Sequence, residues 1–278
     1  MVKKWALILG SSSGFGGASA VELAKAGYNI FGIHLDRQVT MPNVNNIIKK
    51  IERTGQKALF FNMNAADQLR RNDTLDEIKD MFASKKDVQQ INVVLHSLAF
   101  GSLKPFISKS IATRVTKAQM EMTLDVMAHS LVYWVQGLVD RDSLAKKARI
   151  FGMTSAGSQT IFPSYGAVSA AKASLESHIR QLAAELGVMG VTANAIMAGV
   201  TDTPALRKIP GNEKMMSAAK AKNPGARLTT AMDVAKTIVM LMDEKADWIS
   251  GNVLQVDGGE YIVNYTGDKI ARPIKQSF

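Results

Sequence analysis

The sequence contains no cysteine, and several classes of chemistry are thereby excluded. There is no disulfide, no thiolate nucleophile and no cysteine-ligated metal centre. The histidines are scattered without the spacing of a zinc site; they are His34, His96, His129 and His178. We therefore expect no metal site, and the chemistry must depend on hydroxyls, amines, carboxylates or a bound organic cofactor.

Long hydrophobic runs are also missing, and no stretch of about 18 apolar residues is present to form a membrane span. The apolar run at residues 5–9 is too short for a signal peptide and has no small-residue cleavage site after it. These observations predict a cytoplasmic protein without a membrane span.

The net charge is +10, and the basic residues are spread along the chain. A solvated lysine-rich surface is the simplest explanation of this charge. An acidic partner, such as a phosphorylated cofactor or an acidic carrier protein, is the alternative. Nucleic acid is the weakest candidate, because no basic helix carries interleaved aromatic residues.

Short apolar runs alternate with helical patterns along all 278 residues. The runs are nearly continuous rather than alternating, as in parallel strands buried on both faces. They lie at 5–9, 29–35, 58–62, 91–96, 149–154, 191–197 and 253–256. The helical stretches lie at 16–26, 44–54, 67–83, 117–139, 164–186 and 231–244. No linker divides them, so we expect an α/β fold: a single doubly wound Rossmann domain over residues 1–278 with a mainly parallel seven-stranded sheet.

One segment, residues 198 to about 228, interrupts this alternation after the sixth predicted strand. Prolines and glycines surround a short methionine-rich helical piece there. Open α/β sheets bind ligands just past the ends of their strands, and loops of this length are usually functional. We expect a substrate flap, and the alternative is a packing or oligomer contact.

The first predicted strand runs directly into GSSSGFGG at residues 10–17, and a helix follows. Glycines let the chain turn sharply and let backbone N–H groups approach a pyrophosphate, and the helix N-terminus adds its positive dipole end. The strand–turn–helix context predicts a dinucleotide site. The residues expected to contact the dinucleotide are Gly10, Ser12, Ser13, Gly14, Phe15 and Gly16.

Near the end of the second predicted strand, two alternatives for the adenosine ribose stay open. Asp36 lies at about the distance from the glycines that suits an acid bound to the ribose hydroxyls. His34 and Arg37 are placed to bind a 2′-phosphate instead. The sequence favours NADPH on this ground, with NADH possible. Asn64 and Ala65 are expected beside the adenine.

Ser155 follows the fifth predicted strand, and Tyr165 and Lys172 lie on the next predicted helix. A spacing of seven residues gives about 700° of rotation, close to two full turns, so both side chains face the same way if the helix begins by Ser164. A tyrosine hydroxyl can donate to an oxygen that becomes anionic, and an ammonium nearby stabilises the phenolate form. On its own such a pair often has only a structural role.

The order of several motifs resembles the short-chain dehydrogenase/reductase family over nearly the whole chain. Besides the glycine motif and the tyrosine–lysine helix, they are Asn194-Ala195-Ile196 leading to Ala198-Gly199, and the segments 249–253 and 256–259. Ordinary members have tyrosine four residues before the lysine, where this chain has Val168, and a catalytic asparagine where it has Met127. The spacing of seven and the run His96-Ser97-Leu98-Ala99-Phe100 are similar to the enoyl-[acyl-carrier-protein] reductases. Ser155 and the segment 209–227 look most like the enoyl reductase III subtype, which prefers NADPH.

This resemblance implies hydride transfer to the β-carbon of a trans-2-enoyl thioester in fatty acid synthesis. Tyr165 would donate to the thioester carbonyl, Lys172 would hold the nicotinamide ribose, and Ser155 would assist, or serve only as a strand-end hydroxyl. His96 is expected to be structural or beside the cofactor. Further cofactor contacts are expected from Ser97, Leu98, Ala99, Ala198, Gly199, Thr201 and Thr203. An acyl channel, or plain core, is expected from Phe100, Leu206, Met215 and Met216.

Two other functions stay open. One is a reductase of a ketone, a hydroxysteroid or an enoyl-CoA, and the other is a non-enzymatic NADP-binding regulator. An acidic acyl carrier protein would meet basic residues near the flap: Arg207, Lys208, Lys214, Lys220 and Lys222. By analogy with the family we also expect a homotetramer.

Overall fold

A computed structural model describes residues 3–85 and 87–264 of the chain. Seven strands form one parallel sheet in the order β3-β2-β1-β4-β5-β6-β7. The strands are β1 (Lys3–Leu9), β2 (Asn29–His34), β3 (Ala58–Asn62), β4 (Gln89–His96), β5 (Leu144–Ser155), β6 (Thr192–Ala198) and β7 (Val253–Val256). From β1 the chain first adds β2 and β3 on one side and then crosses over to add β4 to β7 on the other side. Such sheets bind dinucleotides at this crossover point, between β1 and β4. The predicted doubly wound parallel sheet is confirmed.

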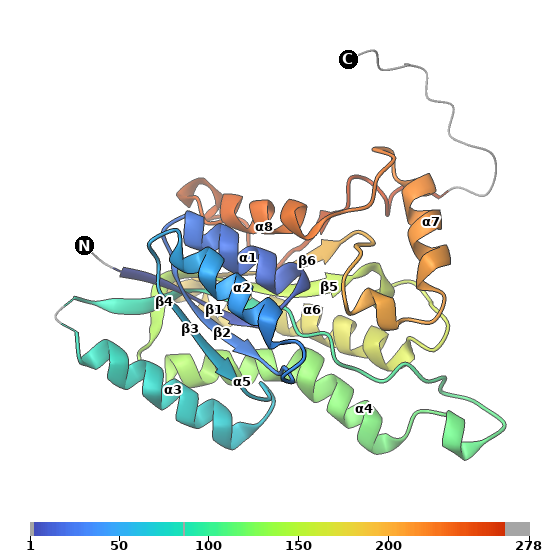
Figure 1. The fold of residues 1–278 in the computed structure, drawn as a ribbon, viewed down its shortest axis with the longest axis horizontal. Helices are drawn as coiled ribbons and strands as arrows, with labels where there is room; N and C mark the ends of the chain where they lie inside the picture. Colours follow the sequence, from blue (N-terminus) through green and yellow to red (C-terminus); the bar gives the residue numbers. More distant parts are fainter. Residues whose placement is uncertain (1–2, 86, 265–278) are drawn as a thin grey trace, which may run out of the picture.

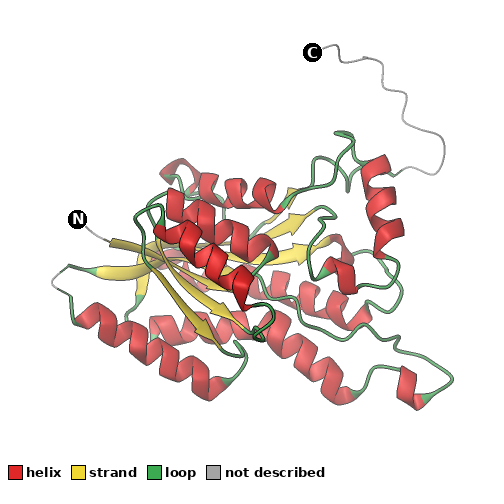
Figure 2. Ribbon diagram, in the orientation of Figure 1, coloured by secondary structure: helices red, strands yellow, loops and turns green. Residues whose placement is uncertain are grey.

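Helices cover both faces of this sheet (Figure 1, Figure 2). One layer contains α1 (Gly14–Lys25), α2 (Met41–Glu52) and α8 (Ala231–Met240). The other contains α3 (Gln68–Ala83), α4 (Lys117–Leu124), α5 (Ser130–Val139) and α6 (Gly166–Leu186). The remaining helix, α7 (Asn212–Lys222), lies in the segment after β6, where the methionine-rich helical piece was predicted.

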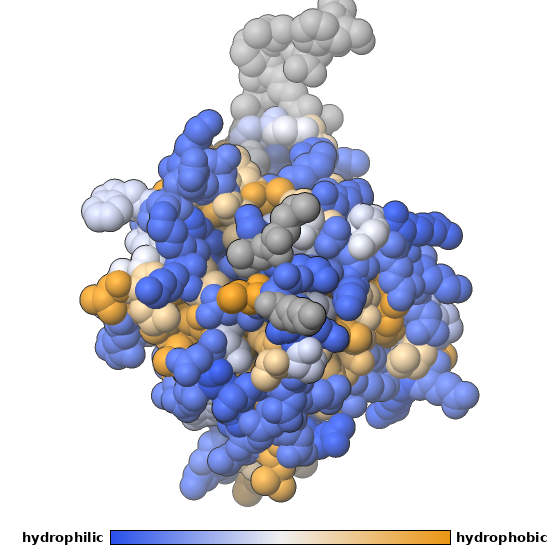
Figure 3. Space-filling view, turned by 90° about the vertical axis from the view of Figure 1, so that its left-hand side faces the viewer, coloured by the Kyte–Doolittle hydropathy of each residue, from blue (hydrophilic) through white to orange (hydrophobic). Residues whose placement is uncertain are grey.

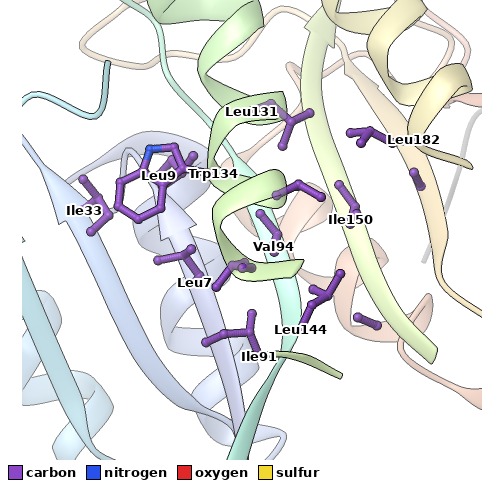
Figure 4. Packing of buried hydrophobic residues seen from close by; sticks show 14 of the residues in the cluster. Leu7, Leu9, Ile33, Ile91, Val94, Leu131, Trp134, Leu144, Ile150 and Leu182 are labelled. Atoms are coloured by element: carbon purple, nitrogen blue, oxygen red, sulfur yellow. The ribbon is translucent and has the colours of Figure 1, made fainter. Parts of the chain in front are cut away.

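Alternate residues of each strand face the two helical layers, because side chains of a strand point to opposite faces in turn. Leu7 and Leu9 pack with Trp134 of α5 in one core, whereas Ala6 and Ile8 belong to the core beneath α1 and α8. Figure 4 shows the first core around β1, β4 and β5. This two-sided burial explains why the predicted strands are continuous apolar runs.

Two predicted helices differ from the observed ones in ways that bear on the site. The expected helix 117–139 is interrupted by a π-helical turn at Asp125–His129, between α4 and α5. The expected helix from Ser164 begins at Gly166 instead, because Ser164 has a left-handed φ of 60° that no α-helix accommodates. Tyr165 is therefore the N-cap of α6 and not a residue of its first turn.

The surface in Figure 3 is largely hydrophilic, with separate hydrophobic patches. Within residues 3–85 and 87–264, no helix is long and apolar enough to cross a membrane.

Candidate active site

The glycine-rich turn is tied to the end of β2. The backbone N–H groups of Gly10 and Ser11 both donate to the carbonyl oxygen of Ile33, at 2.9 and 3.1 Å. A Cβ on Gly16 would lie 2.1 Å from the Gly10 carbonyl oxygen, so only glycine permits this close turn. The turn leads into the N-terminus of α1 at Gly14, whose unpaired amides and positive dipole end suit a pyrophosphate.

Three segments that are distant in sequence meet at this turn. The Ser97 amide donates to the Leu9 carbonyl oxygen at 2.8 Å, which brings the chain after β4 alongside the turn. A Cβ on Gly14 would lie 3.6 Å from Thr203 Cγ2, so the chain after β6 reaches the start of α1. The residues predicted to contact the cofactor after β1, β4 and β6 are thus gathered at one edge of the sheet.

The end of β2 is organised around Asp36. Its carboxylate lies 3.0 Å from Nδ1 of His34, and its backbone exchanges two hydrogen bonds with the side chain of Asn62. Burial raises the pKa of the Asp36 carboxyl, but side-chain hydrogen bonds from Thr40, Ser12 and His34 together hold it below its usual range. The buried His34 ring thus faces a carboxylate, and Arg37 is exposed.

The turn after β3 holds the predicted adenine neighbours. The exposed Asn64 side chain accepts from the Ala66 amide at 3.0 Å, which shapes the turn. Ala65 is buried, and its carbonyl oxygen accepts from Trp134 Nε1 at 2.8 Å. The core on the α5 side therefore anchors this edge of the site.

Ser155 and Tyr165 meet at the end of β5. The two hydroxyl oxygens are 3.5 Å apart. Burial raises the pKa of Tyr165, and the hydrogen bond to Ser155 lowers it in part. The backbone of Gly157 lies against the tyrosine ring, since a Cβ there would be 2.5 Å from Cε1. The site therefore holds a protonated phenol with a fixed ring.

Lys172 lies two turns into α6 and is buried. Its ammonium donates to the Met153 carbonyl oxygen at 2.6 Å. Burial lowers the pKa of Lys172 to about 8, and the Glu176 carboxylate opposes this shift. A lysine so placed can lose its charge within the working range of an enzyme.

His96 lies behind this lysine with no exposed surface. Its Nε2 is 2.9 Å from the Ser130 hydroxyl, which itself donates to the Val126 carbonyl oxygen at 2.9 Å. Burial, with the nearby Lys172 charge, lowers the pKa of His96 to about 3. A ring that stays neutral at ordinary pH is a poor proton carrier.

The apolar surroundings of Tyr165 include Leu103, Met122 and Phe106, which the sequence analysis did not single out. Leu98, Leu103 and Met122 pack with Tyr165 around a small core that contains Met127. The Phe106 ring lies against Gly166, where a Cβ would be 2.5 Å from its Cζ. Only the glycine directly after the tyrosine hinted at this close contact.

The residues predicted to line an acyl channel differ in their exposure to solvent. Phe100 is 61% exposed, Leu206 is buried, and Met215 and Met216 are partly buried on α7. A cavity of about 600 Å³ lies elsewhere, between α8 and the end of β7, with Arg227, Thr229 and Asp257 in its wall. Neither Tyr165 nor Lys172 lines that cavity, so it has no direct part in chemistry at the hydroxyl pair.

Comparison with known proteins places the chain in a family. The family model described as enoyl-(acyl carrier protein) reductase matches residues 10–260. The NADH-dependent enoyl-[acyl-carrier-protein] reductase FabI of Escherichia coli is 30% identical over 183 residues, which are 66% of this chain and 69% of that enzyme. An NADPH-dependent aldehyde reductase-like protein of Arabidopsis thaliana is 25% identical over 91% of this chain and 93% of its own. The chain spans only 62% and 64% of the FabI enzymes of Buchnera aphidicola and Aquifex aeolicus.

Solved structures share the fold. The enoyl-[acyl-carrier-protein] reductase of Aquifex aeolicus superposes with a TM-score of 0.80 at 23% identity, over 95% of this chain and 98% of that one. Acetoin dehydrogenase YohF of Salmonella typhimurium superposes with a TM-score of 0.74 at 21% identity, over 94% of this chain and 99% of that one. The family match covers most of the chain, and the chain therefore belongs to the enoyl-(acyl carrier protein) reductase family, among the short-chain dehydrogenases/reductases.

Proposed function

We propose that the protein is a nicotinamide-dependent oxidoreductase that reduces the carbon–carbon double bond of trans-2-enoyl thioesters carried by an acyl carrier protein, a step of fatty acid synthesis. The observation that carries this proposal is the Ser155–Tyr165 hydroxyl pair, 3.5 Å apart, at the same sheet edge as the glycine turn, with the buried Lys172 held by Met153, two residues before Ser155. The enoyl reductase names of several relatives support it.

The residues present fit a dinucleotide. Gly10 and Gly16 pack so closely against the carbonyl oxygens of Ser97 and Gly10 that neither position has room for a Cβ, and this tight turn leads into the start of α1. The pyrophosphate would lie on this turn, and Lys172 would hold the nicotinamide ribose with the ammonium protons that Met153 does not use. The nicotinamide, when bound, supplies hydride.

Tyr165 carries the proton chemistry. Its raised pKa keeps the hydroxyl protonated, so it donates to the thioester carbonyl oxygen as that oxygen becomes an enolate. Ser155 orients the phenol through the oxygen–oxygen contact. Tyr165 packs against the same small apolar core as Leu98 and Met122, and a low-dielectric setting strengthens this donation.

A reductase of another substrate is the second candidate, since relatives in this superfamily include an aldehyde reductase-like protein and acetoin dehydrogenase. Met127 argues for the enoyl substrate, because a buried thioether replaces the carboxamide that serves the proton relay of ordinary members. Ketone, hydroxysteroid and enoyl-CoA substrates are the competitors to be tested.

For the cofactor we propose NADH in preference to the NADPH that the sequence favours. A 2′-phosphate near Ser12 would meet the Asp36 carboxylate, and the His34 ring is already turned to that carboxylate. A carboxylate at this place suits two ribose hydroxyls instead. The NADH-dependent names of the FabI relatives point the same way.

Residues 198–228 serve in this proposal as the substrate flap of one catalytic domain. Asp202 pairs with Arg207 at 2.8 Å, whereas Lys208, Lys214 and Lys220 are exposed for an acidic carrier. The cytoplasmic location and the homotetramer stay predictions.

The test is an assay of nicotinamide oxidation with purified protein. NADH and NADPH are compared with a crotonyl-carrier thioester and crotonyl-CoA, and an acetoacetyl thioester serves as the ketone substrate. Enoyl-dependent oxidation that falls by about 10²-fold or more in Tyr165→Phe is the expected result. Turnover of the ketone alone would overturn the enoyl proposal and leave the cofactor site intact.

A further inference from the structure

A second buried charge lies one helical turn beyond Lys172. Glu176 and Lys172 are each 6% exposed. They are four residues apart on α6, so their side chains lie on the same face of the helix. Buried carboxylates are costly unless they are paired and hydrogen-bonded, so this one requires an explanation.

Three consecutive residues of β5 contact Lys172 and Glu176 of α6 and Tyr165, the N-cap of that helix. The Met153 carbonyl oxygen accepts from Lys172 at 2.6 Å, and the Ser155 hydroxyl lies 3.5 Å from that of Tyr165. Between them, the Thr154 hydroxyl donates to Glu176 Oε1 at 2.5 Å. The end of the strand therefore fixes the carboxylate in the same array as the hydroxyl and the ammonium.

The other titratable groups around Lys172 supply no counter-charge. On β4, His96 is neutral, because burial lowers its pKa to about 3. At the start of α6, Tyr165 is neutral, because burial raises its pKa. Glu176 is the carboxylate that favours the charged form of the lysine, and it does so against the burial of the ammonium.

We infer that Glu176 is a positioning residue for the reaction: held by Thr154, it keeps the Lys172 ammonium charged and aimed at the cofactor ribose at neutral pH. This inference rests on the role proposed above for Lys172. Glu176 touches neither cofactor nor substrate and acts through the lysine alone.

The test replaces Glu176 by glutamine, which keeps the shape and still accepts from Thr154, and follows NADH affinity against pH by the fluorescence of the bound nicotinamide. Without the carboxylate the ammonium is less stabilised, so the pKa of Lys172 falls further below about 8. The alkaline limb of the affinity profile, where NADH affinity falls as Lys172 loses its proton, should then move to lower pH by about one unit. The alkaline limb of kcat/KM should move with it.

Two further variants separate charge from packing. Glu176→Asp retains the charge and should restore the limb toward its wild-type position. Glu185→Gln makes the same change at an exposed site on the same helix and should leave the limb where it is. If Glu176→Gln does not fold, Glu176→Met fills the site without a hydrogen bond and allows the same comparison.

A uniform loss of affinity at all pH values, with the limb unmoved, would mean a structural role and would overturn the inference. Lys172→Met distinguishes this from failure of the proposed function. If Lys172→Met binds NADH and turns over like the wild type, the proposed role of the lysine is wrong. If Lys172→Met loses both while Glu176→Gln leaves the limb in place, only the inference about Glu176 fails.

Discussion

The Ser155 hydroxyl lies 3.5 Å from the Tyr165 hydroxyl, between the last residue of β5 and the N-cap of α6. Burial raises the pKa of the phenol, and this contact is the one that lowers it. Because Tyr165 precedes the helix, its position depends on the left-handed Ser164 and on the Gly157 backbone beside the ring. The pair is thus fixed from the strand, the turn and the helix at once.

Ser155→Ala should lower kcat/KM for the enoyl thioester about tenfold, the effect of losing one hydrogen bond of about 1.4 kcal/mol. The tyrosine remains, so the loss should be smaller than in Tyr165→Phe. Steady-state assays of both variants measure the difference. Ser177→Ala, an exposed serine of α6, is the matched control and should behave as wild type. Equal losses in Ser155→Ala and Tyr165→Phe would contradict the supporting role given to the serine.

Gly16→Ala should disrupt the dinucleotide turn. The added Cβ would lie 2.1 Å from the Gly10 carbonyl oxygen, so the turn must open and its amides move away from the pyrophosphate. We expect NADH affinity to fall at least about tenfold, a loss of about 1.4 kcal/mol or more. The affinity is measured by fluorescence titration.

Gly187→Ala is the control for this variant. Gly187 has a φ of −57° and no neighbouring atom within 4 Å of an added Cβ. Alanine there should keep the affinity and stabilise the fold by a few tenths of a kcal/mol to about 1 kcal/mol. Similar losses of affinity in both variants would show that the close approach at Gly16 is not the cause.

Asp36→Asn should reduce the preference for NADH over NADPH. The change removes the charge that repels a 2′-phosphate and leaves the shape and the Asn62 backbone contacts in place. We expect the ratio of kcat/KM with NADH to kcat/KM with NADPH to fall about tenfold, which corresponds to about 1.4 kcal/mol. A wild-type protein that already prefers NADPH would sink the NADH proposal and restore the phosphate site expected from the sequence.

The central strands were predictable because they are apolar runs buried on both faces, and the glycine turn was predictable because its context is local. The start of α6 could not be predicted, since nothing in the sequence marks Ser164 as a residue with left-handed backbone. The contact between His34 and Asp36 was not predictable either, because the orientation of the ring depends on the folded structure.

The environment of Lys172 was the least predictable part of the site. The Thr154–Glu176 hydrogen bond joins residues 22 apart, from a strand and a helix, and leaves no local pattern. Only the spacing of four between Lys172 and Glu176 gives any signal, and that spacing is common on solvent-exposed helix faces. Burial, which turns this spacing into a constraint, is known only from the fold.

His96 gives a prediction for stability at acid pH. Burial lowers its pKa from 6.5 to about 3 in the folded protein. Between these values the unfolded chain binds a proton that the native protein does not, so the stabilising effect is complete above pH 6.5 and is lost as pH falls toward 3. His96 alone can change the free energy of unfolding by at most about 1.4 kcal/mol per pH unit.

His96→Leu should remove that slope, because leucine fills a fully buried site without titrating. Ser130 keeps its own donation to the Val126 carbonyl oxygen, so no hydroxyl proton loses its acceptor. Urea unfolding of both proteins at several values between about pH 5 and pH 7.5 measures the effect. The free energy of unfolding of the wild type should fall more steeply on acidification than that of the variant. Parallel curves would mean that His96 takes up its proton in the folded state, and hence that the surroundings of its ring are more polar than their packing indicates.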